Sequence, residues 1–146
     1  MKALSIRQPY AWAIASGFKP VENRTWRRDF HGPVLIHAGK KELVDDVDHV
    51  IRDIAAQTGV SGALIRNAYD QQKRLGGIVG FGVISKCVAS HPSPWFRGPY
   101  GFVFERAQLI GFVPCPGQLG FFDVPAEIIH AIGGAEIARL IAGADE

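Results

Sequence analysis

Three ionisable side chains that can hold an anion or a base occur close together in the segment GFKPVENR, namely Lys19, Glu22 and Arg24. The Arg24 guanidinium offers a planar, two-pronged donor for a phosphate or a base edge, and Lys19 offers a mobile positive charge. Glu22 can accept a hydrogen bond from an exocyclic amine of a base. Together these groups can hold both ends of a nucleotide. The alternative is that Glu22 and Arg24 pair only with each other and join neighbouring strands, an interaction that is weak at a surface.

The three side chains reach one cleft only if the local backbone is irregular. On a regular strand Glu22 and Arg24 share a face, and Lys19 points to the other face. Gly17, two residues before Lys19, readily adopts a left-handed conformation and favours a turn there. We therefore expect Lys19 to lie in a turn that leads into the strand, where all three side chains can meet.

A second group of binding residues is expected in the loop HPSPWFRGPYG, which contains Trp95, Arg97 and Tyr100. The loop is too polar and too rich in turn residues to belong to a barrel core. We expect Trp95 either to stack on a base or to pack locally, with Arg97 and Tyr100 beside it. Trp12 and Trp26 lie in a helix and at the end of a strand, and we expect both in the core.

Positive charge is concentrated at the beginning of the chain. Residues 1–41 contain eight basic and two acidic side chains, whereas the remaining residues contain eight basic and twelve acidic ones. This asymmetry indicates an anionic partner, although solvated surface charge can cluster in the same way. We expect Arg7, Lys40 and Lys41 to meet the phosphates that flank a bound nucleotide, and such contacts make affinity fall with salt.

The order of the predicted elements indicates an α+β fold in a single domain, residues 1–146. Apolar runs predict strands at 3–6, 19–26, 33–38, 77–83, 102–112 and 121–124. Helical spacing predicts helices at 10–15, 43–55 and 64–75, and a C-terminal helix interrupted at 133–134. The acidic helix at 43–55 and the helix after it form a helical-pair insertion between strands. Gly80 and Gly82 permit the close backbone approach or curvature of a closed or nearly closed barrel.

The segment 17–24 matches the Gly-x-Lys-x-x-Glu-x-Arg signature of the ASCH domain family. Further similar segments follow the family order: LSIRQPY before the signature, HGPVLIHA after it, and GPYGFVFE and GQLGFFDV downstream. The chain thus resembles an ASCH domain over residues 3–124. This resemblance implies a PUA-like fold, a small β-barrel with helices packed on its ends, and an RNA-related role. Family members are associated with RNA or DNA binding and, in some small proteins, with hydrolysis of modified nucleosides or of RNA.

Our first hypothesis is a nucleic-acid or nucleotide-binding module, with RNA favoured over DNA as the partner. Its basic cleft is expected to contain Ser5, Arg7, Gln8, Lys19, Glu22, Arg24, Lys40, Lys41, Trp95, Arg97 and Tyr100. A protein-interaction domain is an alternative, in which the acidic helix is the contact face for a protein partner.

The second hypothesis is a hydrolase acting on RNA or on a modified nucleoside, with Lys19, Glu22, His37 and Tyr100 as its catalytic residues. In the amidohydrolase-like members that the chain resembles, a Thr stands at the position of Glu22. A carboxylate there stabilises the Lys19 ammonium and raises its pKa, which argues against Lys19 as a neutral base. His37, at the end of an apolar strand, is more typical of a hydrogen-bonded structural residue than of an acid or base.

The spacing of cysteines and histidines predicts no metal ion, and no Gly-rich loop with the P-loop or dinucleotide spacing indicates a bound cofactor. Cys87 and Cys115 stand far apart and are expected to be buried free thiols, and the five histidines lack metal-ligand spacing. The N-terminus reaches Arg7 and Gln8 before an apolar run develops, so we expect no leader, no membrane span and a cytoplasmic location. We expect any disorder to follow Gly143.

Overall fold

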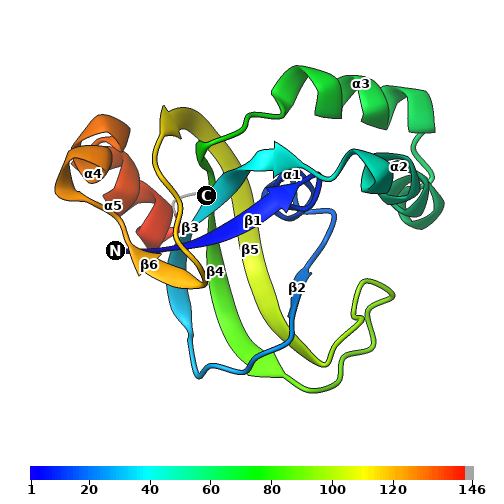
Figure 1. Ribbon diagram of the computed structural model, residues 1–146, viewed down its shortest axis with the longest axis horizontal. Helices are drawn as coiled ribbons and strands as arrows, with labels where there is room; N and C mark the ends of the chain where they lie inside the picture. Colours follow the sequence, from blue (N-terminus) through cyan, green and yellow to red (C-terminus); the bar gives the residue numbers. More distant parts are fainter. Residues whose placement is uncertain (144–146) are drawn as a thin grey trace.

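The computed structural model describes residues 1–143, which form one mixed sheet and two groups of helices (Figure 1). The strands are β1 (Lys2–Gln8), β2 (Val21–Arg24), β3 (Gly32–Glu42), β4 (Gly77–Val88), β5 (Tyr100–Pro114) and β6 (Phe121–Asp123). Within the described residues they lie in the order β2-β5-β4-β3-β1-β6. β1 runs parallel to β3, and the other neighbouring pairs are antiparallel. The predicted α+β class is confirmed.

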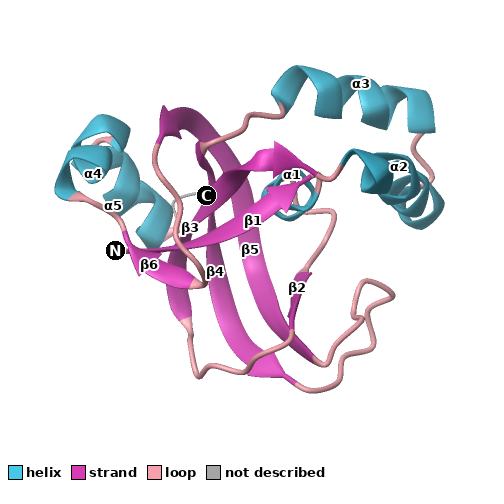
Figure 2. Ribbon diagram, viewed as in Figure 1, coloured by secondary structure: helices cyan, strands magenta, loops and turns pink. Residues whose placement is uncertain are grey.

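The two groups of helices lie on opposite sides of the sheet (Figure 2). One group is α1 (Tyr10–Ala15), α2 (Val44–Thr58) and α3 (Gly62–Gln72), and the other is α4 (Ala126–Ile132) and α5 (Gly134–Ala142). Val34 and Ile36 of β3 pack in the same cluster as α1, whereas Leu35 packs in the same cluster as Leu140 of α5. A strand that is buried on both faces needs apolar residues at successive positions, which explains the continuous apolar run in β3.

The helical pair α2–α3 is inserted between β3 and β4, as predicted, and it packs on α1. Trp12 and Ala13 of α1 share an apolar cluster with Ile54 of α2 and Tyr69 of α3. The Trp12 indole Nε1 also donates a hydrogen bond to Gln72 Oε1 at 2.8 Å. The pair therefore anchors the short helix that leads into the segment with the ionisable residues.

The strand predicted at 19–26 is shorter in the structure because a turn precedes it. Gly17 adopts the predicted left-handed conformation, with φ of 86°. The backbone nitrogens of Phe18 and Lys19 both donate to the Ala13 carbonyl oxygen at 3.0 Å, which closes the end of α1. As a result β2 begins only at Val21.

The sheet is open, so the prediction of a small β-barrel with helices on its ends is wrong. Strands β2 and β6 form the two edges of the sheet and are not paired with each other. They contain only four and three residues, so they offer few backbone groups for a closing ladder. A side chain instead connects β2 with a strand near the other end of the strand order: Arg24 Nη2 of β2 donates to the Ser5 carbonyl oxygen of β1 at 2.7 Å.

No helix within residues 1–143 is long and apolar enough to cross a membrane. Both cysteines are free thiols; Cys115 is buried as predicted, whereas Cys87 is only partly buried. The predicted end of the domain at residue 146 and the disorder predicted after Gly143 lie outside the described residues.

Candidate functional site

A cavity of about 890 Å³ lies where β1, β2 and β3 meet the segment 115–120. Ligand pockets are typically roughly 300–1,000 Å³, so the cavity can hold a nucleotide-sized molecule. Seven of the residues that the sequence singled out line this cavity: Ser5, Arg7, Glu22, Arg24, His37, Lys40 and Lys41. These seven side chains therefore lie around one cavity, between the edge strand β2 and the strands β1 and β3.

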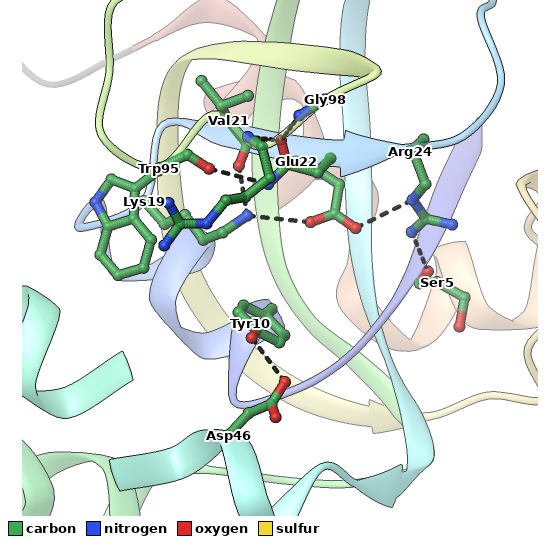
Figure 3. A network of polar contacts seen from close by, with 11 residues as sticks. Ser5, Tyr10, Lys19, Val21, Glu22, Arg24, Asp46, Trp95 and Gly98 are labelled. Atoms are coloured by element: carbon green, nitrogen blue, oxygen red, sulfur yellow. Dashed lines mark hydrogen bonds and ion pairs between the residues drawn. The ribbon is translucent and has the colours of Figure 1, made fainter. Parts of the chain in front are cut away.

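Glu22 lies between Lys19 and Arg24, and a hydrogen bond from each fixes its carboxylate (Figure 3). Lys19 Nζ donates to Glu22 Oε1 at 3.4 Å and also to the Val21 carbonyl oxygen. Arg24 Nε donates to Glu22 Oε2 at 3.0 Å. The turn before β2 places Lys19 beside the other two residues, as the position of Gly17 predicted.

Lys19 holds Glu22 through a hydrogen bond but does not itself line the cavity. Only 3% of the residue is exposed, and its Nζ lies 5.3 Å from the centre of the Tyr10 ring. Burial lowers the pKa of Lys19, and this effect outweighs the rise caused by Glu22. Glu22 raises the pKa of Lys19, as expected, but burial has the larger effect, and the sequence did not show the depth of burial.

Arg24 and Trp26 form one wall of the cavity. The Arg24 guanidinium lies 5.7 Å from the centre of the Trp26 ring. Trp26 packs on Phe102 and Phe121 with ring centroids 5.4 and 6.0 Å away, yet it remains partly exposed and faces the cavity. The prediction that Trp26 lies in the core is therefore confirmed only in part, because its ring packs against the core but also lines the cavity, as Tyr10 does.

Trp95 does not offer a face to a ligand. Only 5% of this residue is exposed, and its ring packs in the apolar cluster with Trp12 and Ile54. Asn23 of β2 holds the loop in place, because its Nδ2 donates to the Trp95 carbonyl oxygen at 3.0 Å and its Oδ1 accepts from the Arg97 backbone nitrogen at 2.8 Å. The stacking role considered for Trp95 is therefore wrong.

Arg97, Tyr100 and Gln8 also lie away from the cavity wall. Gln8 is buried, and its Oε1 accepts from the Trp12 backbone nitrogen at 2.8 Å while its Nε2 donates to the Arg74 carbonyl oxygen. These contacts fix the start of α1 and leave Gln8 no free group for a ligand. Of the four catalytic residues considered for a hydrolase, only Glu22 and His37 reach the cavity, so the structure does not bring that set together.

His37 is buried between β1 and the segment 115–120, with 2% of its surface exposed. Its Nε2 lies 2.7 Å from the Cys115 carbonyl oxygen, which can only accept a hydrogen bond, so Nε2 carries the proton. Its Nδ1 is then an acceptor for the Ser5 hydroxyl at 2.9 Å. Burial lowers the pKa of His37, so the imidazole is neutral at pH 7.

Three basic side chains on the cavity wall face solvent. Arg7, Lys40 and Lys41 are exposed, and none of them forms an ion pair with another group in residues 1–143. Exposed cations without an acidic partner are available to phosphates. The mouth of the cavity is therefore basic.

The segment 115–120, with the sequence CPGQLG, lines the opposite side of the cavity and was not predicted as part of the site. Leu119 at its tip is 99% exposed. Gly117 lies against the His37 ring, where an added Cβ would stand 2.5 Å from Cε1. The cluster of Pro and Gly in this segment signals a loop, but only the tertiary fold shows that the loop faces β1.

The fold defines the class: an α+β domain with an open mixed sheet and a cavity lined by β1, β2 and β3. The family model of the ASCH domain matches residues 4–96, more than half of the chain, so the chain belongs to the ASCH domain family. ASCH domains are PUA-like domains that generally bind RNA. The match ends at Phe96, short of the expected residue 124, so the segment 115–120 lies beyond it. No curated protein matches the chain.

Proposed function

We propose that the chain binds single-stranded nucleic acid, RNA in preference to DNA, and that the cavity holds one nucleotide of the strand. The observation that carries this proposal is the combination of a fixed carboxylate, an aromatic wall and a basic mouth in one cavity. Each part matches a different portion of a nucleotide.

The base is expected to enter beside Trp26 and Glu22. Base stacking on an aromatic side chain contributes roughly 1–3 kcal/mol per base. Each Glu22 oxygen already accepts one hydrogen bond from Lys19 or Arg24, but a carboxylate has about four lone-pair sites. The remaining sites can accept hydrogen bonds from an amine on the base edge.

The phosphates are expected at the mouth of the cavity. Arg7, Lys40 and Lys41 carry free positive charge there, and the carboxylate of Glu22 is neutralised by its own two cations. A phosphate that approaches the mouth therefore meets a net positive surface.

Fluorescence anisotropy with a labelled single-stranded RNA, and with DNA of the same sequence, tests the proposal. We expect wild type to bind the RNA more tightly than the DNA. Lys40→Glu/Lys41→Glu should weaken RNA binding at least tenfold, or about 1.4 kcal/mol. The control Arg52→Glu/Lys86→Glu reverses two exposed charges away from the cavity and should bind like wild type. Equal losses in the two double variants would contradict the proposal.

The aromatic wall has a separate test. Trp26→Leu keeps apolar contact with Phe102 and Phe121 but removes the stacking surface, so RNA affinity should fall by about 1–3 kcal/mol. Trp95→Leu changes a buried ring outside the cavity and should bind RNA normally wherever its thermal unfolding shows that it is folded. Unchanged affinity of folded Trp26→Leu would exclude base stacking at this wall.

A further inference from the structure

The hydrogen bond between the Ser5 hydroxyl and His37 is not used in the nucleotide-binding proposal. We propose that Ser5 is a nucleophile activated by His37 and that the cavity hydrolyses carboxylic esters, favouring those whose alcohol portion is anionic. This activity goes beyond the proposed binding function, because it needs an acyl group and not a nucleic-acid strand.

The arrangement contains a nucleophile, a base and a group that orients the base. Ser5 Oγ is 2.9 Å from His37 Nδ1, and His37 Nε2 is 2.7 Å from the Cys115 carbonyl oxygen. The carbonyl requires a proton on Nε2, so Nδ1 presents its lone pair to the Ser5 hydroxyl. The contacts run from the Ser5 hydroxyl to the His37 imidazole and on to the Cys115 carbonyl. An activated serine has the same arrangement, with an adjacent base that a third group orients.

The sheet holds both side chains rigidly. Ser5 of β1 and His37 of β3 stand opposite each other in the parallel ladder. The register between β3 and β4 shifts between Ile36 and His37, and such irregularities re-aim side chains at functional sites. On the other side of the ring, Gly117 leaves room only for the imidazole. The His37 ring therefore cannot turn away from Ser5 without displacing the segment 115–120.

The Ser5 hydroxyl is open to the cavity. Ser5 is half-buried and lines the cavity wall. Gly39, on the same strand as His37, leaves space beside it, because an added Cβ would be 4.0 Å from Ser5 Oγ. Arg24 Nη2 donates to the backbone carbonyl oxygen of Ser5, so a positive charge is fixed beside this residue. A positive charge beside the nucleophile favours the oxyanion that develops during attack. The exposed cations at the mouth favour an anionic alcohol portion.

The reaction proceeds in two balanced steps. In the first, Ser5 Oγ attacks the ester carbonyl carbon and its proton passes to His37 Nδ1. The bond from that carbon to the alcohol oxygen breaks, and the alcohol leaves with the proton from Nδ1. In the second, water attacks the acyl-Ser5 ester, its proton passes through Nδ1 to Ser5 Oγ, and the carboxylic acid is released. No oxidant or reductant is required.

Two probes without a nucleotide test the proposal. A fluorophosphonate labels activated serines, and p-nitrophenyl acetate reports ester cleavage by colour, with intact mass and peptide mapping to locate the adduct. We expect one adduct, on Ser5. Ser5→Ala and His37→Gln should each lower the rate of p-nitrophenyl acetate cleavage at least about 100-fold. Gly39→Leu should lower the rate of ester cleavage to a similar extent. The leucine side chain fills the space beside the Ser5 hydroxyl, while Ser5 and His37 themselves are unchanged. Ser85→Ala, an exposed serine outside the cavity, should react like wild type.

An adduct on any other residue, or an unchanged rate in Ser5→Ala, would overturn the proposal. The conclusion does not depend on the folding of His37→Gln, because Ser5→Ala and Gly39→Leu leave the buried imidazole in place. RNA binding by wild type separates the two proposals. A wild-type chain that binds RNA but cleaves no ester would refute the nucleophile and leave the binding function standing.

Discussion

Glu22 accepts one hydrogen bond from Lys19 and one from Arg24, so two cations neutralise a single carboxylate at the base of the cavity. The two cations differ in burial, because Lys19 is 3% exposed and the Arg24 side chain is 19% exposed. Loss of the shared carboxylate would therefore leave a buried ammonium without its counter-charge, whereas loss of Lys19 would leave Glu22 paired with Arg24.

This asymmetry gives a stability prediction. Glu22→Gln should lower the free energy of unfolding by about 3 kcal/mol, since breaking a buried pair by removing one partner is costly. Lys19→Met should cost less, because Arg24 still neutralises Glu22. Urea unfolding at pH 7 measures both values. A larger loss for Lys19→Met than for Glu22→Gln would show that Lys19, and not the carboxylate, holds the network together.

His37 predicts a dependence of stability on pH. Burial lowers its pKa in the folded protein, whereas in the unfolded chain it titrates near pH 6.5. As the pH falls below that value, the unfolded state gains a proton that the folded state does not, so the free energy of unfolding decreases. His37→Gln should remove this contribution to the pH dependence of unfolding. His130 is exposed, and His130→Gln should retain the contribution of His37. Urea unfolding at pH 7.5 and 5.5 measures the difference, and equal pH dependence in wild type and His37→Gln would contradict the assignment.

At the residue scale, seven of the residues that the sequence singled out lie on the wall of one cavity. Residue types and spacing pointed to Ser5, Glu22 and Arg24, but they did not show which side chains are buried. Trp95 is buried and Trp26 is partly exposed on the cavity wall, because a polar loop can fold its one indole inward and a strand end can leave its indole partly exposed. Local sequence does not contain that information.

At the element scale, α1 fits against the sheet because β4 has glycines where the two approach. A Cβ on Gly80 would stand 2.7 Å from Ala15 Cβ and 2.9 Å from the Gln108 carbonyl oxygen. The period-two pattern of glycines in β4 predicted this close approach. The open sheet was not predictable in the same way, since closure depends on whether two short edge strands meet, and they lie about one hundred residues apart in the chain.

The close approach gives a prediction for the element. Gly80→Ala should lower the free energy of unfolding by about 1–3 kcal/mol, because the backbone neighbours must shift to admit the methyl group. Gly111→Ala in β5 meets nothing within 4 Å and should change stability by less than about 0.5 kcal/mol. Thermal or urea unfolding of the pair measures the contrast. Equal stability of the two variants would show that α1 is not tightly packed on β4.

At the scale of the whole molecule, the charge asymmetry of the sequence becomes a basic mouth on one cavity. Three exposed cations without ion-pair partners in residues 1–143 should give a slope of log affinity against log salt of about −2 for single-stranded RNA. Lys40→Ala/Lys41→Ala should reduce the size of that slope by about 1.4. Anisotropy titrations between low and physiological salt measure it. If the double variant has the same slope of log affinity against log salt as wild type, Lys40 and Lys41 do not contact the phosphates.

Ultraviolet crosslinking of single-stranded RNA to the wild-type chain can show whether nucleic acid occupies this cavity. Mass spectrometry of the digested adducts identifies the crosslinked peptides. We expect them to contain Arg7, Trp26, Lys40, Lys41 or the segment 115–120, all of which line the cavity. Crosslinks confined to α2 and α3, or to α4 and α5, would contradict the claim and place the RNA on a different surface.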